Sequence, residues 1–405
     1  MQPLDGITVL DLTRVLSGPY CTMLLADMGA RVIKVEQPGK GDDTRAWGPP
    51  FHYPADQSPT AGDREKGESA YFLSINRNKE SVTLDFKQAE GRAVLDGLIA
   101  KSDVLVENFR PGTLGKIGLD YKTLAAAHPR LVYCSVSGFG QTGPRRKEPG
   151  YDAVMQGEGG LMSITGAASG PPYRLGVAIA DIVSGMFAAY GIAMALFART
   201  RTGEGQEVDV AMLDAVTALL TYQAGNFFAS GNAPSRLGNR HPSIVPYETF
   251  EASDGEFVLA VGNDDQWRRF CAVAGLPGDE RFATNRQRVT QYDELRPLVA
   301  ERLRSGSRQF WIDRLTTAGV PCGSVRNLQE LFDDPQLGAR EMIAQVEHAS
   351  IGMLKVLGVP VKLSGTPGSV RTPPPTLGQH TDEVLTLDLG YSADAIAGLG
   401  RQNVI

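Results

Sequence analysis

The chain has 405 residues, more than one compact core usually supports, so we expect two domains. Hydrophobic residues at 42% and charged residues at 21% are ordinary for a folded globular protein and exclude extended disorder. The formal net charge of -6 supplies no basic footprint for nucleic acid or for a membrane surface.

The first half of the sequence alternates predicted strands with predicted helices. An apolar, β-branched run at 7–12 is followed by a helical pattern over 17–29 and a second strand at 31–36, which together form a βαβ unit. The alternation continues with strands and one helix at 81–86, 88–102, 103–109 and 131–139. This order predicts an α/β fold with a Rossmann-like parallel sheet covered by helices. No GxGxxG opens any of these helices, so dinucleotide binding is not supported.

The second half has a different texture. A strand and one long helix are predicted within 203–224, and the chain from about 225 is rich in Gly, Pro, Asn and Ser, which is typical of a linker. A strand and amphipathic helices from Gln266 to Ala318 then predict a smaller α+β domain. The tail from about 330 is rich in proline and is expected to be extended before a short final helix.

The stretch GVAIADIVSGMFAAYGIAMALFA at 176–198 contains a single charged residue, Asp181. A carboxylate buried without a partner is costly, so this one must be held or used. Asp181 stands directly before an apolar run that predicts a buried helix rather than a membrane span, so we expect it at or near the helix N-cap. The pattern leaves two roles open: a helix cap, or a nucleophile that is already ionised at neutral pH.

Other chemistries are poorly served by the sequence. The five histidines are scattered with no i,i+4 pair, and the four cysteines form no CxxC pair, so neither a metal site nor a disulfide framework is indicated. No GxSxG motif is present for a serine nucleophile. The cysteine pattern and an acidic N-terminal segment favour a cytoplasmic protein.

Seven stretches resemble, in chain order, motifs of the class III CoA-transferases of the formyl-CoA transferase and carnitine CoA-transferase type. They are DLTRVLSGPYCTMLLADMGARVIKVEQPGKGDDTR, NRNKESVTLDFK, DVLVENFRPG, SVSGFGQTGP, YDAVMQG, ADIVSGM and the late LGQHTDEVL. The resemblance implies an interlocked homodimer, each chain having a Rossmann-like large domain built from both termini and a smaller central α+β domain. The expected parts are a large domain at 1–210, a linker at 211–240, a small domain at 241–325 and a return segment at 326–405.

The resemblance also implies a mechanism and a substrate. It places the catalytic aspartate of the family on Asp181. This carboxylate takes an acyl group from a CoA thioester as a mixed anhydride, and an incoming carboxylic acid reacts afterwards. Coenzyme A is then a substrate, with no tightly bound cofactor and no metal. The expected partners are acyl-CoA and carboxylic acid substrates, with no nucleic acid and no membrane.

Similarity to the family assigns a pocket for CoA. Arg14 and Val15 are expected to line its thioester end, and Tyr151 and Asp152 fall where formyl-CoA transferases carry a Tyr-Glu pair near the active carboxylate. The other expected pocket residues lie at successive βα turns: Leu84, Lys87, Asn108, Phe109, Arg110, Lys116 and Ile117. Taken one at a time, each Lys or Arg of this set would more often be a solvated surface charge.

The segment 236–267 bears on the carboxylic acid. It lacks the run of glycines that formyl-CoA transferases carry, which argues against oxalate and formate, and it is similar to enzymes handling succinate, glutarate and hydroxymethylglutarate. Arg236, Arg240 and His241 are candidates for a second substrate carboxylate, or equally for dimer contacts.

Two other functions remain as alternatives. An α-methylacyl-CoA racemase would place a histidine where this chain has Tyr151, because racemisation needs a second acid/base group opposite the aspartate. A CoA-ester binding protein without catalysis would be expected to lack Asp181, which is present.

Overall fold

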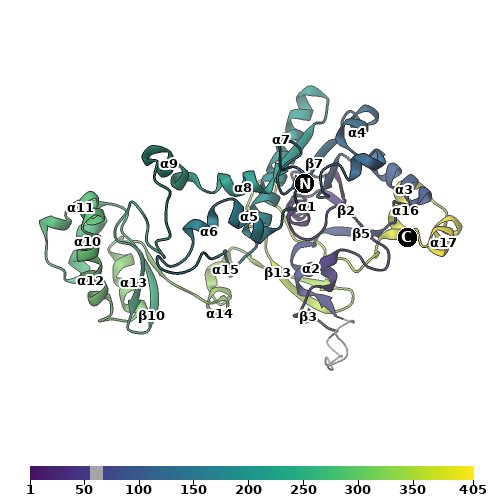
Figure 1. The fold of residues 1–405 in the computed structure, drawn as a ribbon. Helices are drawn as coiled ribbons and strands as arrows, with labels where there is room; N and C mark the ends of the chain where they lie inside the picture. The colour runs from purple at the N-terminus through teal and green to yellow at the C-terminus, as the bar shows by residue number, and fades with distance from the viewer. Residues whose placement is uncertain (55–66) are drawn as a thin grey trace. The chain divides into compact units, whose positions relative to one another are not determined.

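The computed structural model describes residues 1–54 and 67–405 and divides the chain into two compact units (Figure 1). The large unit consists of Met1–Gly160, Leu175–Thr221 and Gln336–Ile405. The small unit consists of Leu161–Arg174 and Tyr222–Pro335. The sequence places the small domain at 241–325, so the small unit includes additional segments on both sides of that range.

The large unit is built on one six-stranded sheet in which every neighbouring pair of strands is parallel. Its strands are β1 (Thr8–Asp11), β2 (Arg31–Glu36), β5 (Lys79–Thr83), β6 (Val104–Glu107), β7 (Val132–Ser137) and β8 (Glu207–Ala211). They lie in the order β5-β2-β1-β6-β7-β8, so β1 is central and pairs Val9 with both Val32 and Val104. This doubly wound order confirms the expected large parallel sheet and puts a switch point between β1 and β6.

Both faces of this sheet are buried, because alternate side chains of each strand point to opposite faces. Val9 and Val32 belong to a core covered by α1 (Ser17–Asp27) and α7 (Ile179–Thr202). Leu10, Ile33 and their neighbours pack on the other face under α3 (Ala89–Ala100) and α16 (Thr381–Leu389).

The C-terminal segment returns to the edge strand β5. The backbone nitrogen of Ser81 donates to Nδ1 of His380 at 3.1 Å, and that of Thr83 donates to Oγ1 of Thr381 at 3.0 Å. The late Gly-x-His-Thr stretch therefore satisfies the open edge of the sheet with side chains. α16 and α17 (Ala393–Arg401) then pack beside α3 (Figure 1).

The small unit has its own sheet and core. β9 (Tyr247–Ala252), β10 (Gly255–Ala260) and β11 (Cys322–Ser324) form an antiparallel sheet in the order β11-β10-β9. Its helices are α10 (Asp264–Ala274), α11 (Asn285–Thr290), α12 (Tyr292–Leu303) and α13 (Arg308–Thr317), with η3 (Glu280–Phe282). Phe257, Phe270 and Trp311 lie in its buried centre.

The remaining elements are short. They are η1 (Asp43–Ala46), β3 (Phe51–His52), β4 (Glu68–Ser69), α2 (Ala70–Ile75), η2 (Leu114–Ile117), α4 (Tyr121–Ala127), α5 (Asp152–Glu158), α6 (Leu161–Ile164), α8 (Met212–Ala218), α9 (Thr221–Ser230), α14 (Leu328–Phe332), α15 (Pro335–Ala339), β12 (Ile343–His348) and β13 (Gly352–Leu357).

Two parts of the second half differ from the prediction. The single long helix expected within 203–224 is two helices, α8 and α9, separated at Leu219 and Leu220. The tail contains the antiparallel hairpin β12–β13 rather than only extended chain, and Val346, Leu354 and Val356 of its strands form a buried cluster with Leu73. This alternation is short and is flanked by proline-rich sequence, which hid it.

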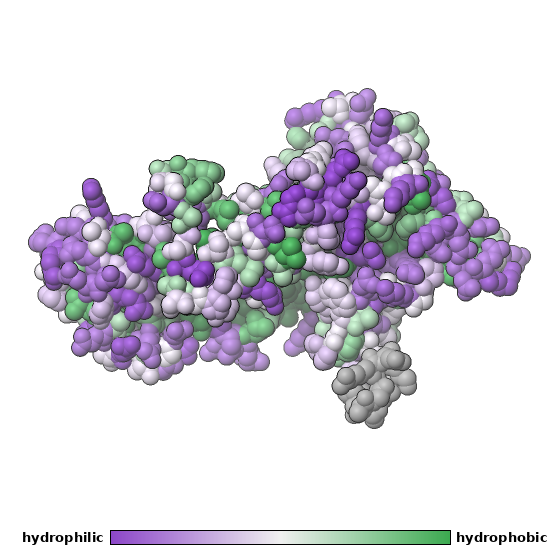
Figure 2. Space-filling model, viewed as in Figure 1, coloured by the Kyte–Doolittle hydropathy of each residue, from purple (hydrophilic) through white to green (hydrophobic). Residues whose placement is uncertain are grey.

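Helix α7 is buried on one side only. Ala188 and Ile192 are fully buried in the core, but Met186, Tyr190 and Phe197 are exposed on the opposite side. The helix is long and apolar enough to cross a membrane by length and composition, a test that core helices of soluble proteins also pass. Helix α9 of the small unit likewise exposes Phe227 and Phe228, where hydrophobic residues gather in Figure 2.

Candidate active site

The carboxyl ends of the central strands and the start of α7 enclose a cavity of about 360 Å³, at the place where doubly wound sheets bind ligands. It lies within the large unit. Its walls come from the turn after β1, the turn after β6, the segment 148–151 and the first turn of α7. Ser17, Tyr151 and Asp181 are among the residues that line it.

Asp181 is the third residue of α7, near the N-cap as expected, and its half-buried side chain faces the cavity. Burial first, and then the nearby charge of Asp152, raise the pKa of Asp181 to about 7. A hydrogen bond with the Ser17 side chain acts in the opposite direction on this pKa. Near neutral pH the group therefore exists both as a carboxylate and as a neutral acid.

The cap of α7 comes from Asp152 in α5. Its Oδ1 accepts a hydrogen bond from the backbone nitrogen of Ala180 at 2.9 Å, and its Oδ2 accepts one from Nε2 of Gln156 at 2.8 Å. Gln156 is fully buried, and its Oε1 accepts from the backbone nitrogen of Leu175 at 2.9 Å. This chain of contacts fixes the first turn of α7 and with it the Asp181 backbone.

A second cavity of about 350 Å³ adjoins the first, since Arg14, Phe109 and Thr113 line both. Leu84 and Lys87, which follow β5, form part of its wall. Together the two cavities make an elongated crevice along the carboxyl ends of the sheet, with cationic groups spaced along it.

The structure brings most of the expected site residues to this crevice. The first cavity is lined by Arg14, Val15, Asn108, Phe109, Arg110, Tyr151 and Asp181, and the second by Arg14, Leu84, Lys87 and Phe109. Lys116 and Ile117 lie on η2 and Asp152 lies under α7, and these three line neither cavity. The expectation that Lys116 and Ile117 meet CoA therefore finds no support in the geometry of this chain alone.

Asn108 contributes through the backbone of its neighbour. Its Oδ1 accepts from the Arg14 nitrogen at 2.9 Å and its Nδ2 donates to the Arg14 carbonyl at 2.7 Å, so the turn after β6 holds the turn after β1. The Arg14 guanidinium lies over the Phe109 ring at 5.5 Å and pairs with Asp43 at 3.4 Å.

Sequence reasoning missed two residues beside Asp181. Ser17 begins α1 and hydrogen-bonds to the Asp181 side chain; its place at a predicted helix start was a usable signal. Tyr71 of α2 lies near enough that the charges of Asp181 and Asp152, added to burial, raise its pKa to about 12. No local pattern marks Tyr71, because α2 approaches α7 only through the tertiary fold.

The three candidates for a second carboxylate lie in the small unit. Arg240 stacks over the Tyr292 ring at 3.4 Å, and His241 lies 5.3 Å from the Tyr222 ring and 5.4 Å from the Tyr247 ring. Burial lowers the pKa of His241, so it is a weak cation at neutral pH. Arg236 donates from Nη2 to the Gly170 carbonyl at 2.9 Å.

Metal ligands do not gather in the described part of the chain. Over residues 1–54 and 67–405, no group of three or more His, Cys, Asp or Glu side chains is arranged to hold an ion. Nothing in these residues assigns a metal to the crevice.

Comparisons with known proteins agree with the fold. The chain is 44% identical over 386 residues to the succinate–glutarate CoA-transferase of Agrobacterium fabrum, covering 95% of each chain. It is 42% identical over 367 residues to the acetyl-CoA:oxalate CoA-transferase of Acetobacter aceti, covering 90% of each. A crystal structure of a CAIB/BAIF family protein from Brucella suis matches with a TM-score of 0.82 at 41% identity, covering 96% of this chain and 99% of that one. The model of CoA-transferase family III matches residues 4–381, and the chain therefore belongs to that family.

Proposed function

We propose that the protein moves CoA from an acyl-CoA thioester to a free dicarboxylic acid, with Asp181 as the nucleophile. The assignment of Asp181 as nucleophile rests on which of the three carboxylates lining the cavity form ion pairs. Asp43 and Glu148 pair with Arg14 and Arg145, whereas Asp181 forms no ion pair among the described residues. A carboxylate without a cation keeps its electron density available for attack.

The reaction balances through two anhydrides. Asp181 attacks the thioester carbonyl, the C–S bond breaks, and CoA thiolate leaves an acyl-aspartyl anhydride. The thiolate then attacks the Asp181 carbonyl carbon, which releases the first carboxylic acid and leaves an aspartyl-CoA thioester. The incoming carboxylate attacks this thioester, the C–S bond breaks, and a second anhydride forms as CoA thiolate is released again. The thiolate then attacks the new acyl group, which forms the product thioester and frees the Asp181 carboxylate. CoA must remain bound throughout, which the elongated crevice favours.

The crevice has the chemistry that CoA requires. Lys87 and Arg110 supply cations for its phosphates on a chain whose net charge is -6, so the attraction is local rather than global. The apolar walls of the second cavity, Leu84 and Phe109, suit the adenine face and the pantetheine arm.

The names of the relatives support a dicarboxylic acid as acceptor. Succinate, glutarate and oxalate, the acids in those names, each carry two carboxylates. A relative at 42% identity is named for oxalate, so oxalate belongs in the test although the segment 236–267 lacks the glycine run. We propose succinate or glutarate first and test oxalate beside them.

The test crosses several acyl-CoA donors with succinate, glutarate, oxalate and formate and detects new thioesters by mass spectrometry. New thioester supports the transferase; exchange of the α-proton alone would identify a racemase, and neither would leave a binding protein. Incubation with acyl-CoA followed by hydroxylamine should label Asp181. Asp181→Asn should lower the rate by at least about a thousandfold while acyl-CoA still binds. Labelling of Asp152 or Glu158 instead would refute the assignment.

We also propose a homodimer, the interlocked form that the family resemblance implies. The exposed apolar face of α7, made by Met186, Phe187, Tyr190, Met194 and Phe197, supports it, because such a face on one helix needs a cover. A second copy of the chain is the proposed cover. A reducing, cytoplasmic location is proposed as well, supported by four cysteines that all carry free thiols.

A further inference from the structure

The turn between β1 and α1 contains a backbone conformation that its sequence does not favour. Val15 has φ 71°, in the left-handed region that a β-branched side chain rarely adopts. It also lines the first cavity, two residues before Ser17 and its contact with Asp181. Such a conformation persists only where the surroundings hold it, and it is most often found at functional sites.

The two residues before Val15 are held by side chains from three different strands and turns. The nitrogen of Thr13 donates to Oδ1 of Asp11 at 2.9 Å, and its carbonyl accepts from Nζ of Lys34 at 2.8 Å. Arg14 is held at both its nitrogen and its carbonyl by Asn108. The path of the chain into Val15 is therefore fixed.

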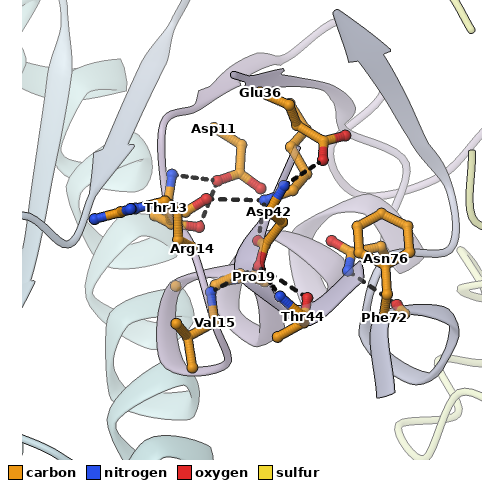
Figure 3. A network of polar contacts seen from close by, with 12 residues as sticks. Asp11, Thr13, Arg14, Val15, Pro19, Glu36, Asp42, Thr44, Phe72 and Asn76 are labelled. Atoms are coloured by element: carbon orange, nitrogen blue, oxygen red, sulfur yellow. Dashed lines mark hydrogen bonds and ion pairs between the residues drawn. The ribbon is translucent and has the colours of Figure 1, made fainter. Parts of the chain in front are cut away.

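Val15 itself is held by Asp42, which Figure 3 shows between this turn and Thr44. Oδ1 of Asp42 accepts from the backbone nitrogen of Val15 at 3.2 Å and from that of Thr44 at 3.0 Å. Oδ2 lies 2.9 Å from Nζ of Lys34, with both side chains fully buried. The backbone nitrogen of Asp42 donates to Oε2 of Glu36 at 2.9 Å.

Stability alone does not explain this pair. A buried ion pair spends much of its attraction on lost hydration, and apolar replacements of similar volume are often as stable. The Asp42–Lys34 pair forms hydrogen bonds to both sides of one short turn. Lys34 donates to the Thr13 carbonyl, and Asp42 accepts from the Val15 nitrogen. The pair therefore fixes a geometry.

We propose that Asp42, backed by Lys34, is a positioning residue that keeps Val15 left-handed and thereby places Ser17 against Asp181. Relaxing φ of Val15 to a negative value would redirect the chain through Leu16 and move the first residue of α1. The Val15 side chain would also leave its place in the cavity wall. This role rests on Asp181 as the nucleophile.

The test replaces Asp42 by asparagine, which keeps the volume but removes the charge that Lys34 meets. We expect kcat to fall by about a hundredfold, the scale of a small misplacement in a reacting site, with a smaller change in KM for acyl-CoA. Adding Val15→Gly should restore kcat by at least about tenfold, because glycine adopts the left-handed region without strain.

Asp27→Asn is the matched control. It breaks another buried pair, Asp27–Arg77 at 2.6 Å, at the far end of α1 from the crevice. Both Asp27→Asn and Asp42→Asn should lower the melting temperature, but only Asp42→Asn should lower kcat. Wild-type kcat in Asp42→Asn, or no recovery on adding Val15→Gly, would overturn the proposal.

A readout without substrate separates this proposal from the proposed nucleophile. Amide hydrogen exchange over residues 12–17 should accelerate in Asp42→Asn and stay unchanged in Asp27→Asn. If wild-type enzyme transfers CoA but trapping never labels Asp181, the nucleophile is wrong while the exchange result stands. If Asp181 is labelled but exchange over 12–17 is the same in wild type and Asp42→Asn, the positioning role is wrong.

Discussion

The carboxylate of Asp152 caps the helix whose third residue is Asp181, through a 2.9 Å hydrogen bond from the backbone nitrogen of Ala180. The same carboxylate raises the pKa of Asp181 by its charge, after burial has already raised it. One side chain thus fixes the position of the proposed nucleophile and adjusts its protonation. These two effects can be separated by substitution.

Asp152→Asn should shift the pH dependence of kcat/KM to lower pH. The amide oxygen of asparagine can still accept from Ala180, but the charge that opposes ionisation of Asp181 is gone, so its pKa falls. In the wild type, kcat/KM should decline as pH falls through about 7, where Asp181 takes up a proton. A pH series of initial rates measures both profiles.

Glu107 needs a control, because burial raises its pKa to about 7 as well. It lies under the turn after β6, where Oε2 accepts from the Phe109 nitrogen at 2.8 Å. In Glu107→Gln the kinetic pKa should persist whatever happens to the rate. A profile that loses this pKa in Glu107→Gln and keeps its position in Asp152→Asn would contradict the assignment to Asp181.

Local pattern was enough for the large sheet. The strands predicted at 31–36 and 131–139 match β2 (Arg31–Glu36) and contain β7 (Val132–Ser137), because fully buried parallel strands are short, continuous apolar runs. The strand predicted at 81–86 begins and ends later than β5 (Lys79–Thr83). The residues Leu-Asp-Phe continue the strand-like pattern beyond the last residue of β5. The break between α8 and α9 contains no proline, so the sequence pattern did not predict it.

The site was predictable where a motif carries the chemistry and not where distant segments meet. Asp181 stood out as one charge in an apolar run, and the residues expected at βα turns mostly line the crevice. The left-handed Val15 could not be inferred, because its own propensity opposes it and Asp42 lies 27 residues away. Likewise, the sequence around Asp152 contains no signal that its side chain caps a helix beginning at Ile179.

Removing a cation from the crevice should weaken CoA-ester binding and leave the covalent step largely intact. Lys87→Ala and Arg110→Ala should each weaken binding by about 1.5–3 kcal/mol, the range for hydrogen bonds to charged groups. Calorimetry with a CoA ester measures the loss, and dephosphorylated CoA shows which phosphate each residue meets. Lys101→Ala, a charge at the end of α3 outside both cavities, is the control.

Lys116→Ala tests whether Lys116 binds CoA, as the family resemblance implies, or does not, as the geometry of the two cavities indicates. Lys116 lines neither cavity, so in this chain its removal should leave CoA-ester affinity unchanged. A loss comparable to that of Lys87→Ala would restore Lys116 to the binding site as the resemblance implies.

The proposed homodimer predicts that α7 tolerates no charge on its exposed face. Tyr190, 64% exposed in the single chain, should be buried by the partner, so Tyr190→Asp should prevent assembly and abolish transfer. Leu387→Asp, on α16 and 72% exposed, is the matched control and should assemble normally. Light scattering that finds a stable, fully active 43.5 kDa species in the wild type would refute the dimer.

Asp181 should cost stability when it is ionised, and the pH dependence of that cost identifies it. Its pKa is about 7 in the folded chain and roughly 3.9 in the unfolded chain, so the folded state holds the extra proton between these values. The stabilisation from that proton is fully present below pH about 4 and is lost as pH rises through about 7. Asp181→Asn cannot titrate there and escapes the loss. Its melting temperature relative to wild type should therefore rise steadily from pH 4 to pH 8, measured by differential scanning calorimetry without ligand. A constant difference over this interval would mean that Asp181 is not the buried acid with the raised pKa, and the electrostatic part of its assignment as nucleophile would fail with it.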